Sequence, residues 1–141
     1  MKVYLDSNIF IYAAINSEKM GDNARQILQF MEEGRFSGAT SFTAFEELLF
    51  VIFKERGKET AVEAGKAFLL LNNLELINFS KESMLCALDG ISNYKLRPRD
   101  AMHLAAIKSK SIPYILSEDS DFDSIQGIKR YGLAGLLKKM S

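Results

Sequence analysis

The sequence predicts an α/β fold, a three-layer α/β/α sandwich around a central parallel sheet of four to five strands. Short apolar runs alternate along the chain with longer segments in which apolar residues recur at the helical period of about 3.6 residues. Strands that are separated by helices form a parallel sheet with both faces covered. No repeat, low-complexity tract or linker rich in Pro and Gly divides the 141 residues, so we expect one domain over 1–141.

The first half of the chain supplies two expected strands and three expected helices. The polar residues Asp6, Ser7 and Asn8 end the first strand, and Gly34 closes the first helix. The expected elements, in order, are a strand at 2–5, a helix at 22–33, a strand at 37–40, and helices at 43–55 and 59–71.

The second half repeats the alternation of strands and helices. Ser80 is a typical helix N-cap, and Pro98 suits the first turn of a helix, where its missing N–H has no partner to lose. The expected elements, in order, are a strand at 75–78, a helix from 80 to 88 or beyond, a helix at 98–110, a strand at 112–116, a short fifth strand at 127–130 and a helix at 133–139.

The composition is that of an ordinary globular protein. No apolar run approaches the roughly 20 residues of a membrane helix, and the N-terminus lacks a signal-peptide pattern. The single cysteine, Cys86, lies among apolar residues, so we expect a buried, inert thiol and a reducing cytoplasm. The 18 basic and 18 acidic residues cancel, which is mild evidence against a nucleic-acid binder. Metal ions held by carboxylates would supply part of the missing positive charge.

Two acids follow expected strands. The ligand crevice of a parallel α/β sheet lies outside the carboxyl ends of its strands. Asp6 comes directly after the first expected strand, and Asp119 comes after the fourth. Asp6 stands between two apolar segments, where a charge is costly unless it is paired, binds a metal or caps a helix. Strand-end placement therefore favours Asp6 and Asp119 as site residues.

Further acids open apolar helices, where an acid also stabilises the helix dipole whatever its function. Glu46 and Glu47 point about 100° apart, so at most one of them faces the crevice. Asp100 lies three residues before His103, the only histidine, and the two share a helix face. One histidine and a distant cysteine are too few ligands for zinc, so we expect His103 to be a packed or supporting residue.

The densest acidic stretch, 117–123, suggests a calcium loop because Asp119, Asp121 and Asp123 alternate. The match fails because the sixth position is Ser124 rather than Gly, and the twelfth is Arg130 rather than Glu. We therefore expect a loop after the fourth strand whose first acid faces the crevice.

The joint placement of these acids is more informative than any one of them. Asp6, Glu47, Asp100 and Asp119 all lie where a strand ends or a helix begins. Carboxylates that are brought together repel one another, and a hard cation such as Mg²⁺ or Mn²⁺ relieves that repulsion. Such a cation polarises a phosphoryl oxygen and lowers the pKa of a bound water. The sequence therefore predicts a divalent-metal site that needs neither a histidine base nor a cysteine nucleophile.

Four segments together resemble the motifs of PIN domains, in the right order and over nearly the whole chain. They are LDSNIFI at 5–11, the pair TS at 40–41 followed by ELL at 47–49, RPRDAMHLA at 97–105 and LSEDSDF at 116–122. The resemblance implies the three-layer fold and a Mg²⁺- or Mn²⁺-dependent endoribonuclease. The metal ligands that it implies are Asp6, Glu47, Asp100 and Asp119, with Asp121 as an outer or water-orienting ligand and with Ser117 and Asn8 as supporting polar residues.

The resemblance leaves the biological role and some assignments open. Many compact PIN proteins are toxins of VapC-type toxin–antitoxin pairs and dimerise, so a homodimer and a small antitoxin protein are expected partners beside the RNA substrate. Others process RNA. A shift of one residue would exchange Glu46 for Glu47, although the spacing from Ser41 favours Glu47.

Other functions fit less well. A phosphatase of the haloacid-dehalogenase type needs a second Asp two positions after the first, where this chain has Asn8, and a phosphoryl-receiver domain needs an Asp where Asn78 stands. A catalytically inactive PIN-like module that binds a protein partner or RNA is the alternative from outside enzymology.

Basic and aromatic residues offer candidates for RNA contact. Lys95, Arg97 and Arg99 precede the helix of Asp100 and are candidates for phosphate contacts, or else solvated loop charges. A set of phenylalanines crowds one apolar helix, so we expect core or dimer packing rather than base stacking. Its members are Phe42, Phe45, Phe50 and Phe53.

Overall fold

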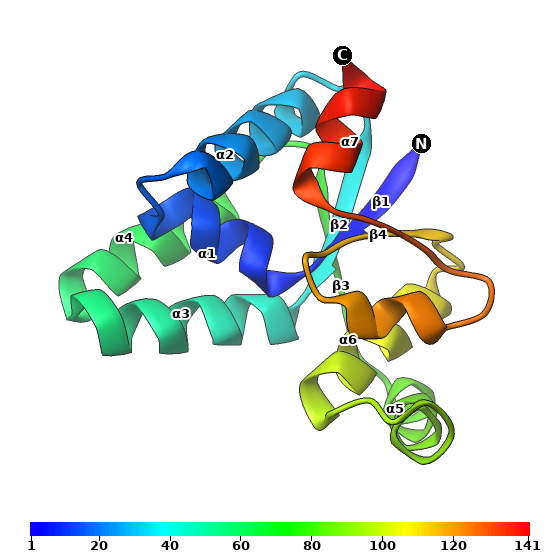
Figure 1. Ribbon diagram of the computed structural model, residues 1–141. Coiled ribbons are helices and arrows are strands. Elements are labelled where there is room, and N and C mark those ends of the chain that lie inside the picture. The colour runs from blue at the N-terminus through cyan, green and yellow to red at the C-terminus, as the bar shows by residue number, and fades with distance from the viewer.

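A five-stranded, fully parallel sheet forms the centre of the computed structural model, which describes all residues, 1–141 (Figure 1). Its order, β3-β2-β1-β4-β5, places the first strand in the middle. The chain adds strands first on one side of β1 and then on the other, so the strand order reverses between β1 and β4. The strands are β1 (Lys2–Leu5), β2 (Ser37–Ser41), β3 (Leu74–Ile77), β4 (Tyr114–Leu116) and β5 (Lys129–Tyr131).

Helices cover both faces of the sheet, which confirms the predicted three-layer sandwich. They are α1 (Ser7–Ile15), α2 (Lys19–Glu32), α3 (Phe42–Arg56), α4 (Lys58–Leu69), α5 (Lys81–Tyr94), α6 (Pro98–Ser109), the short 3-10 helix η1 (Ser120–Ser124) and α7 (Leu133–Met140). Figure 1 shows α5 and α6 on one side of the sheet and α1, α2, α3, α4 and α7 on the other.

Two hydrophobic cores separate the layers because side chains alternate along a strand. Val3 and Leu5 of β1 point into the core beneath α1, α2, α3, α4 and α7. Tyr4, between them, points into the core beneath α5 and α6. The hydroxyl of Tyr4 thus lies on the other face of the sheet, close to α6.

The structure differs from the sequence-based expectation in four places. A helix, α1, begins directly after Asp6, where the apolar run at 9–11 gave no helical period. The acidic stretch expected to be a loop contains η1. Cys86 is half-buried rather than buried. Of the two kinds of packing expected for the phenylalanines of α3, core packing is wrong for Phe42, Phe50 and Phe53, which are exposed, whereas Phe45 is partly buried.

No helix of the protein combines the length and the hydrophobicity that spanning a bilayer would require.

Candidate functional site

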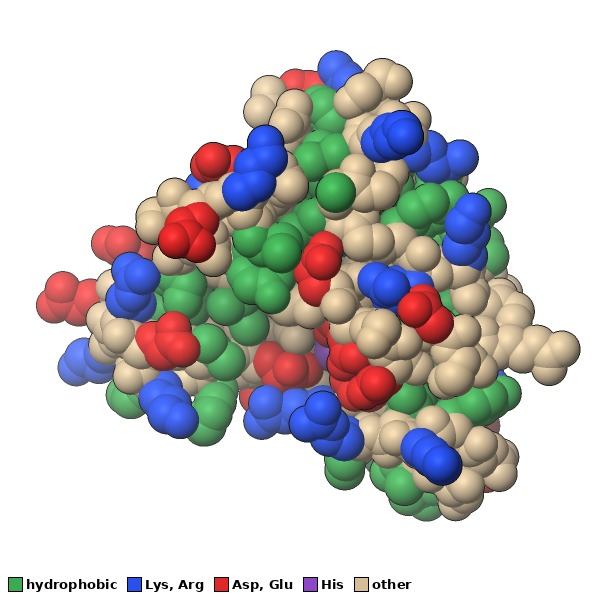
Figure 2. Space-filling model, viewed as in Figure 1, with side chains coloured by type: hydrophobic (Ala, Val, Ile, Leu, Met, Phe, Trp, Pro, Cys, Tyr) green, Lys and Arg blue, Asp and Glu red, His purple; other side chains and the backbone are tan.

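The predicted acids gather at the carboxyl ends of β1 and β4, where the strand order reverses. The backbone N–H of Asp6 donates to the carbonyl of Leu116 at 3.0 Å, which joins the end of β1 to the end of β4. A hollow of about 480 Å³ opens at this edge of the sheet, and Glu47, Asp100 and Asp119 line it. Figure 2 shows acidic side chains gathered there, with basic side chains beside them and the histidine beneath.

Asp6 is buried, with 5% of its surface exposed, and hydrogen-bond donors surround its carboxylate. Its Oδ1 accepts from the backbone N–H of Ser7 at 2.7 Å, a contact that also caps α1. Its Oδ2 accepts from the hydroxyl of Ser117 at 2.6 Å. Donors on both oxygens stabilise a buried carboxylate that would otherwise be costly.

Glu47, on α3, is held in a similar way. Its Oε1 lies 2.9 Å from Nε2 of His103, and its Oε2 accepts from the hydroxyl of Ser7 at 3.0 Å. Arg99 approaches the same Oε2 at 3.9 Å. Burial alone would raise the pKa of Glu47, but the hydrogen bond and charge of His103, with smaller effects of Ser7 and Arg99, lower that pKa overall.

His103 is buried and connects the two carboxylates. Its Nε2 lies 3.3 Å from Oδ1 of Asp6 as well as 2.9 Å from Glu47. Burial opposes the charged imidazole, but the hydrogen bond to Glu47 and the charges of Asp6, Glu47 and Asp100 raise the pKa of His103 overall. Asp6 and Glu47 with their donors are called the bonded pair below.

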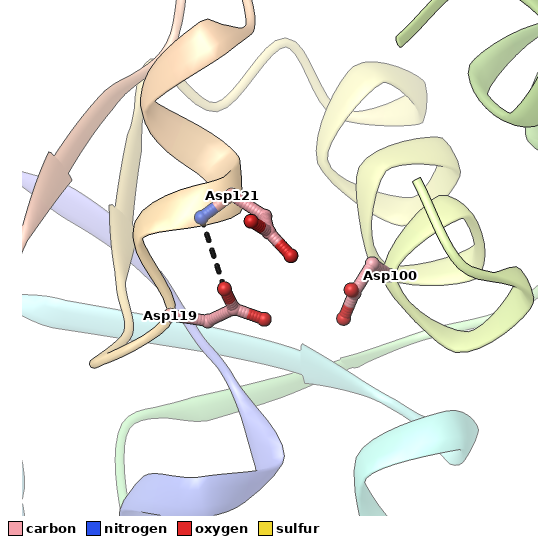
Figure 3. A group of neighbouring side chains, drawn as sticks. All are labelled: Asp100, Asp119 and Asp121. Atoms are coloured by element: carbon pink, nitrogen blue, oxygen red, sulfur yellow. Dashed lines mark hydrogen bonds between the residues drawn. The ribbon is translucent and has the colours of Figure 1, made fainter. Parts of the chain in front are cut away.

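Three further aspartates form a second group, in which the carboxylates face one another. Asp100, in the first turn of α6, faces Asp119 and Asp121 from the segment after β4 (Figure 3). One carboxylate oxygen from each lies within 4.8 Å of the others. Oδ1 of Asp119 accepts from the backbone N–H of Asp121 at 2.9 Å, which caps η1. These three residues are called the aspartate trio.

The aspartate trio carries more negative charge than the neighbouring cations offset. Burial and, to a smaller extent, the charges of Asp119 and Asp6 together raise the pKa of Asp100 to about 6. The neighbouring cations His103 and Arg97 offset only part of this increase. An oxygen-only donor set with excess negative charge fits a hard divalent cation such as Mg²⁺ or Mn²⁺ and not zinc.

The two neighbouring glutamates of α3 face different hollows. Glu47 points into the hollow, whereas Glu46 is exposed and lines a separate apolar hollow with the phenylalanines of α3. Ser117 donates a hydrogen bond to Asp6. The Oδ1 of Asn8 is buried without a hydrogen-bond partner.

The basic candidates lie around the hollow. Arg97 and Arg99 line it beside Asp100, and both are exposed. Lys95 lies in the adjoining hollow that Asp121 also lines. Two of the three basic candidates thus line the same hollow as the acids.

Sequence reasoning missed three hydroxyl residues that support the site. Ser7 touches both Asp6 and Glu47, and adjacency to Asp6 was the available signal. Tyr4 and Ser41 reach the site only through His103, on the face of the sheet that α6 covers. No local sequence pattern connects residues that lie on two strands and a helix.

Comparisons with known proteins agree with this architecture. The family model of the PIN domain matches residues 3–128. VapBC2 from Rickettsia felis, bound to a DNA fragment from its promoter, contains a chain 18% identical to this one, with a TM-score of 0.73 over 94% of this chain and 98% of that chain.

VapC20 from Mycobacterium tuberculosis, a sarcin-ricin loop cleaving toxin, is 15% identical with a TM-score of 0.68 over 86% of this chain and 93% of that chain. A toxin–antitoxin complex from Klebsiella pneumoniae has a chain 20% identical, with a TM-score of 0.66 over 90% and 95% of the two chains. At these identities the likeness establishes a shared fold. No curated protein matches the sequence.

Proposed function

Since this chain belongs to the PIN domain family, whose model matches residues 3–128, we propose that it is a divalent-metal-dependent endoribonuclease. Family membership and the toxin structures that share the fold support a nuclease in general. The single observation that carries the finer proposal is the aspartate trio beside the bonded pair. Glu47, Asp100 and Asp119 line one hollow at the edge of the sheet where ligands bind, and one oxygen from each carboxylate of the trio lies within 4.8 Å of the others, which supports a site for a hard cation.

The residues divide the work of phosphodiester hydrolysis. Asp6, Glu47, Asp100 and Asp119 hold the cation, which supplies Lewis acidity toward a phosphoryl oxygen and lowers the pKa of water. Asp121 orients water at the exposed edge of the trio. Arg97 and Arg99 hold the phosphate at the hollow. They supply positive charge there although the net charge of the chain is zero.

Cleavage of labelled RNA tests this function directly. The wild-type protein is expected to cleave with Mg²⁺ or Mn²⁺ and to stop when EDTA is added. Asp6→Asn serves as the inactive control, purified in parallel. Equal cleavage by wild type and mutant would show that a contaminating nuclease or another site is responsible. Metal and RNA binding without any cleavage would instead favour the inactive binding module.

We also propose that the protein is the toxin of a toxin–antitoxin pair. Complexes of that kind share its fold, and an apolar groove of about 440 Å³ between α1, α2 and α4 offers a surface for a partner. Phe10, Leu28 and Phe68 line the groove, and Arg25 and Glu63 stand among its polar residues. An amphipathic segment of the antitoxin fits this mixture of apolar floor and charged residues.

Growth assays test the toxin role. Induction of the chain is expected to arrest cell growth, and co-expression of the antitoxin is expected to relieve the arrest. Ala64→Arg, which places a charge in the groove, should prevent relief while growth arrest persists. Unimpaired growth at good soluble expression would count against a toxin.

A second copy of the chain is the proposed partner of the exposed α3 surface. The side chains of Phe42, Phe50 and Phe53 are 62%, 56% and 58% exposed and lie around one apolar hollow. Exposed apolar patches of this kind mark interaction surfaces. Light scattering is expected to give the mass of a dimer for wild type and of a monomer for Phe53→Glu. A monomeric wild type would refute this assignment.

A further inference from the structure

We propose that Tyr4 and His103 form a positioning pair that fixes Asp6 and Glu47 in the site, although Tyr4 touches neither carboxylate. The inference rests on the proposed function only for what the positioned carboxylates do. It rests on a series of buried hydrogen bonds on the face of the sheet that α6 covers.

This series of hydrogen bonds begins on β2, continues through β1 and reaches the site through α6. The hydroxyl of Tyr4 lies 2.8 Å from Oγ of Ser41 and 2.6 Å from Nδ1 of His103. On the far side of the ring, Nε2 lies 2.9 Å from Glu47 and 3.3 Å from Asp6. Ser41, Tyr4 and His103 are buried, with no more than 1% of their surface exposed. Water therefore does not compete for these contacts.

Proton placement makes the contact with Glu47 independent of the charge on the ring. In the neutral imidazole, the Tyr4 hydroxyl donates to Nδ1, so the ring proton resides on Nε2 and is donated to Glu47. In the charged imidazole, both nitrogens carry protons, and Tyr4 accepts from Nδ1 while it donates to Ser41. Hydroxyl groups can reverse direction in this way, so Nε2 is a donor in both forms.

The Nε2 donor of His103 offsets the repulsion between the carboxylates of Asp6 and Glu47. The two carboxylates come from β1 and α3 and repel each other in a crevice with little access to water. A donor fixed between them sets their separation and leaves lone pairs on both residues for a cation. Groups that hydrogen-bond to metal-binding carboxylates typically change metal affinity or activity by about 10- to 100-fold.

A merely structural tyrosine or histidine would have different consequences. His103→Gln keeps an N–H donor near the position of Nε2, and His103→Asn keeps an amide only near the position of Nδ1. Both variants lose the ring from the core. A packing role therefore predicts equal effects, whereas the positioning role predicts that Gln rescues and Asn does not.

The first experiment uses nitrogen NMR of the only histidine in the chain, in metal-free protein. Wild type is expected to show a slowly exchanging Nε2 proton and a hydrogen-bonded Nδ1. Tyr4→Phe should lose the protection of the Nε2 proton and shift the Nδ1 signal. Tyr114→Phe, which removes a hydroxyl from β4, is the matched control and should leave the spectrum unchanged. Ser41→Ala is the substitute if Tyr4→Phe fails to fold.

The second experiment measures Mn²⁺ affinity by calorimetry. His103→Asn is expected to weaken Mn²⁺ binding about 10- to 100-fold, and His103→Gln by less than about threefold. Unaltered NMR signals in Tyr4→Phe and Ser41→Ala, or equal Mn²⁺ affinities for the Gln and Asn variants, would overturn the positioning role. A wild type that binds no Mn²⁺ and cleaves no RNA would refute the proposed function. The NMR result would still decide whether Tyr4 and His103 position the carboxylates.

Discussion

The bonded pair and the aspartate trio lie side by side, yet the protein treats their carboxylates in opposite ways. Every oxygen of Asp6 and Glu47 meets a donor from Ser7, Ser117 or His103. In the trio, the pKa of Asp100 rises to about 6 because burial and the neighbouring acids disfavour its charge. The pKa of Glu47 is lowered instead.

The two groups therefore differ in what stabilises them: folding alone stabilises the bonded pair, whereas the trio needs a cation. The bonded pair is stabilised within the protein, so its geometry is set before any ligand arrives. The trio remains repulsive until a positive charge enters. Removing charge from the trio should therefore affect activity and leave stability intact, while the same change in the bonded pair should affect both.

Asp119→Asn tests the trio and has the largest expected effect. Loss of one cation ligand removes several kcal/mol of transition-state stabilisation, or roughly a thousandfold in RNA cleavage rate. The amide oxygen still accepts from Asp121, and one repulsive charge disappears, so the melting temperature should hold or rise. RNA cleavage and thermal melting measure the two quantities. A melting temperature that falls with activity would contradict the contrast.

Asp6→Asn applies the same chemical change to the bonded pair. Both oxygens of Asp6 face donors, so an amide nitrogen must point at the Ser117 hydroxyl or at the donors around Oδ1. The mismatch should lower the free energy of unfolding by about 1–3 kcal/mol, in addition to the loss of cleavage. Urea denaturation of the metal-free protein checks it. Unchanged stability would mean that the donors around Asp6 are not needed for folding.

The pH dependence of stability should distinguish the trio from the bonded pair, because the pKa of Asp100 is raised. Its folded-state pKa of about 6 lies above the ordinary value of about 3.9 for the unfolded chain. The stability that this group contributes is therefore present at low pH and lost as pH rises through about 6. Compared with Asp100→Asn, metal-free wild type should lose melting temperature between about pH 4 and 6.5. Mn²⁺ affinity should rise over the same interval, and parallel pH curves for the two proteins would contradict this assignment.

Arg97→Ala tests the basic rim, where smaller effects are expected. Each phosphate contact with a single strand contributes about 0.7 to the slope of log affinity against log salt concentration. Binding of RNA to an Asp119→Asn background should lose about that much slope when Arg97 is removed. Lys139→Ala, on α7, is the matched control and should leave the slope unchanged. Equal slopes for all three proteins would remove Arg97 from the RNA path.

Glu46→Gln is expected to have the smallest effect. Its side chain is exposed and lies outside the hollow, so stability should stay within about 0.5 kcal/mol of wild type. The cleavage rate should change by no more than about twofold, whereas Glu47→Gln should lose most activity. Side-by-side rate measurements of the two variants check the assignment. A large loss in Glu46→Gln would reverse it.

Sequence reasoning recovered the sheet and the acids because both leave local signals. Alternating apolar runs and helical periods identified the parallel fold, and strand-end logic placed Asp6 and Asp119 at its crevice. Helix α1 was missed because a continuous apolar run has no helical period to detect. Core packing and dimer packing both stayed open for the phenylalanines of α3, because hydrophobicity alone does not show which face of a helix the chain itself covers.

The division of the site into two groups could not be predicted. It depends on Tyr4, Ser41 and His103, which lie on β1, β2 and α6 and meet only after the sheet has formed. Sequence showed that His103 shares a helix with Asp100, whereas its direct contacts are with Glu47 and Asp6. Long-range contacts of this kind leave no trace in residue spacing.

Anomalous diffraction from crystals soaked in Mn²⁺ tests most directly whether these carboxylates serve one divalent cation. The expected result is a manganese peak in the hollow, bound by Asp100 and Asp119 of the trio and by Asp6 and Glu47 of the bonded pair. A second soak of Asp119→Asn crystals should lose that peak. A hollow without manganese at millimolar concentration, or a peak bound only at the exposed edge by Asp121, would contradict the central claim.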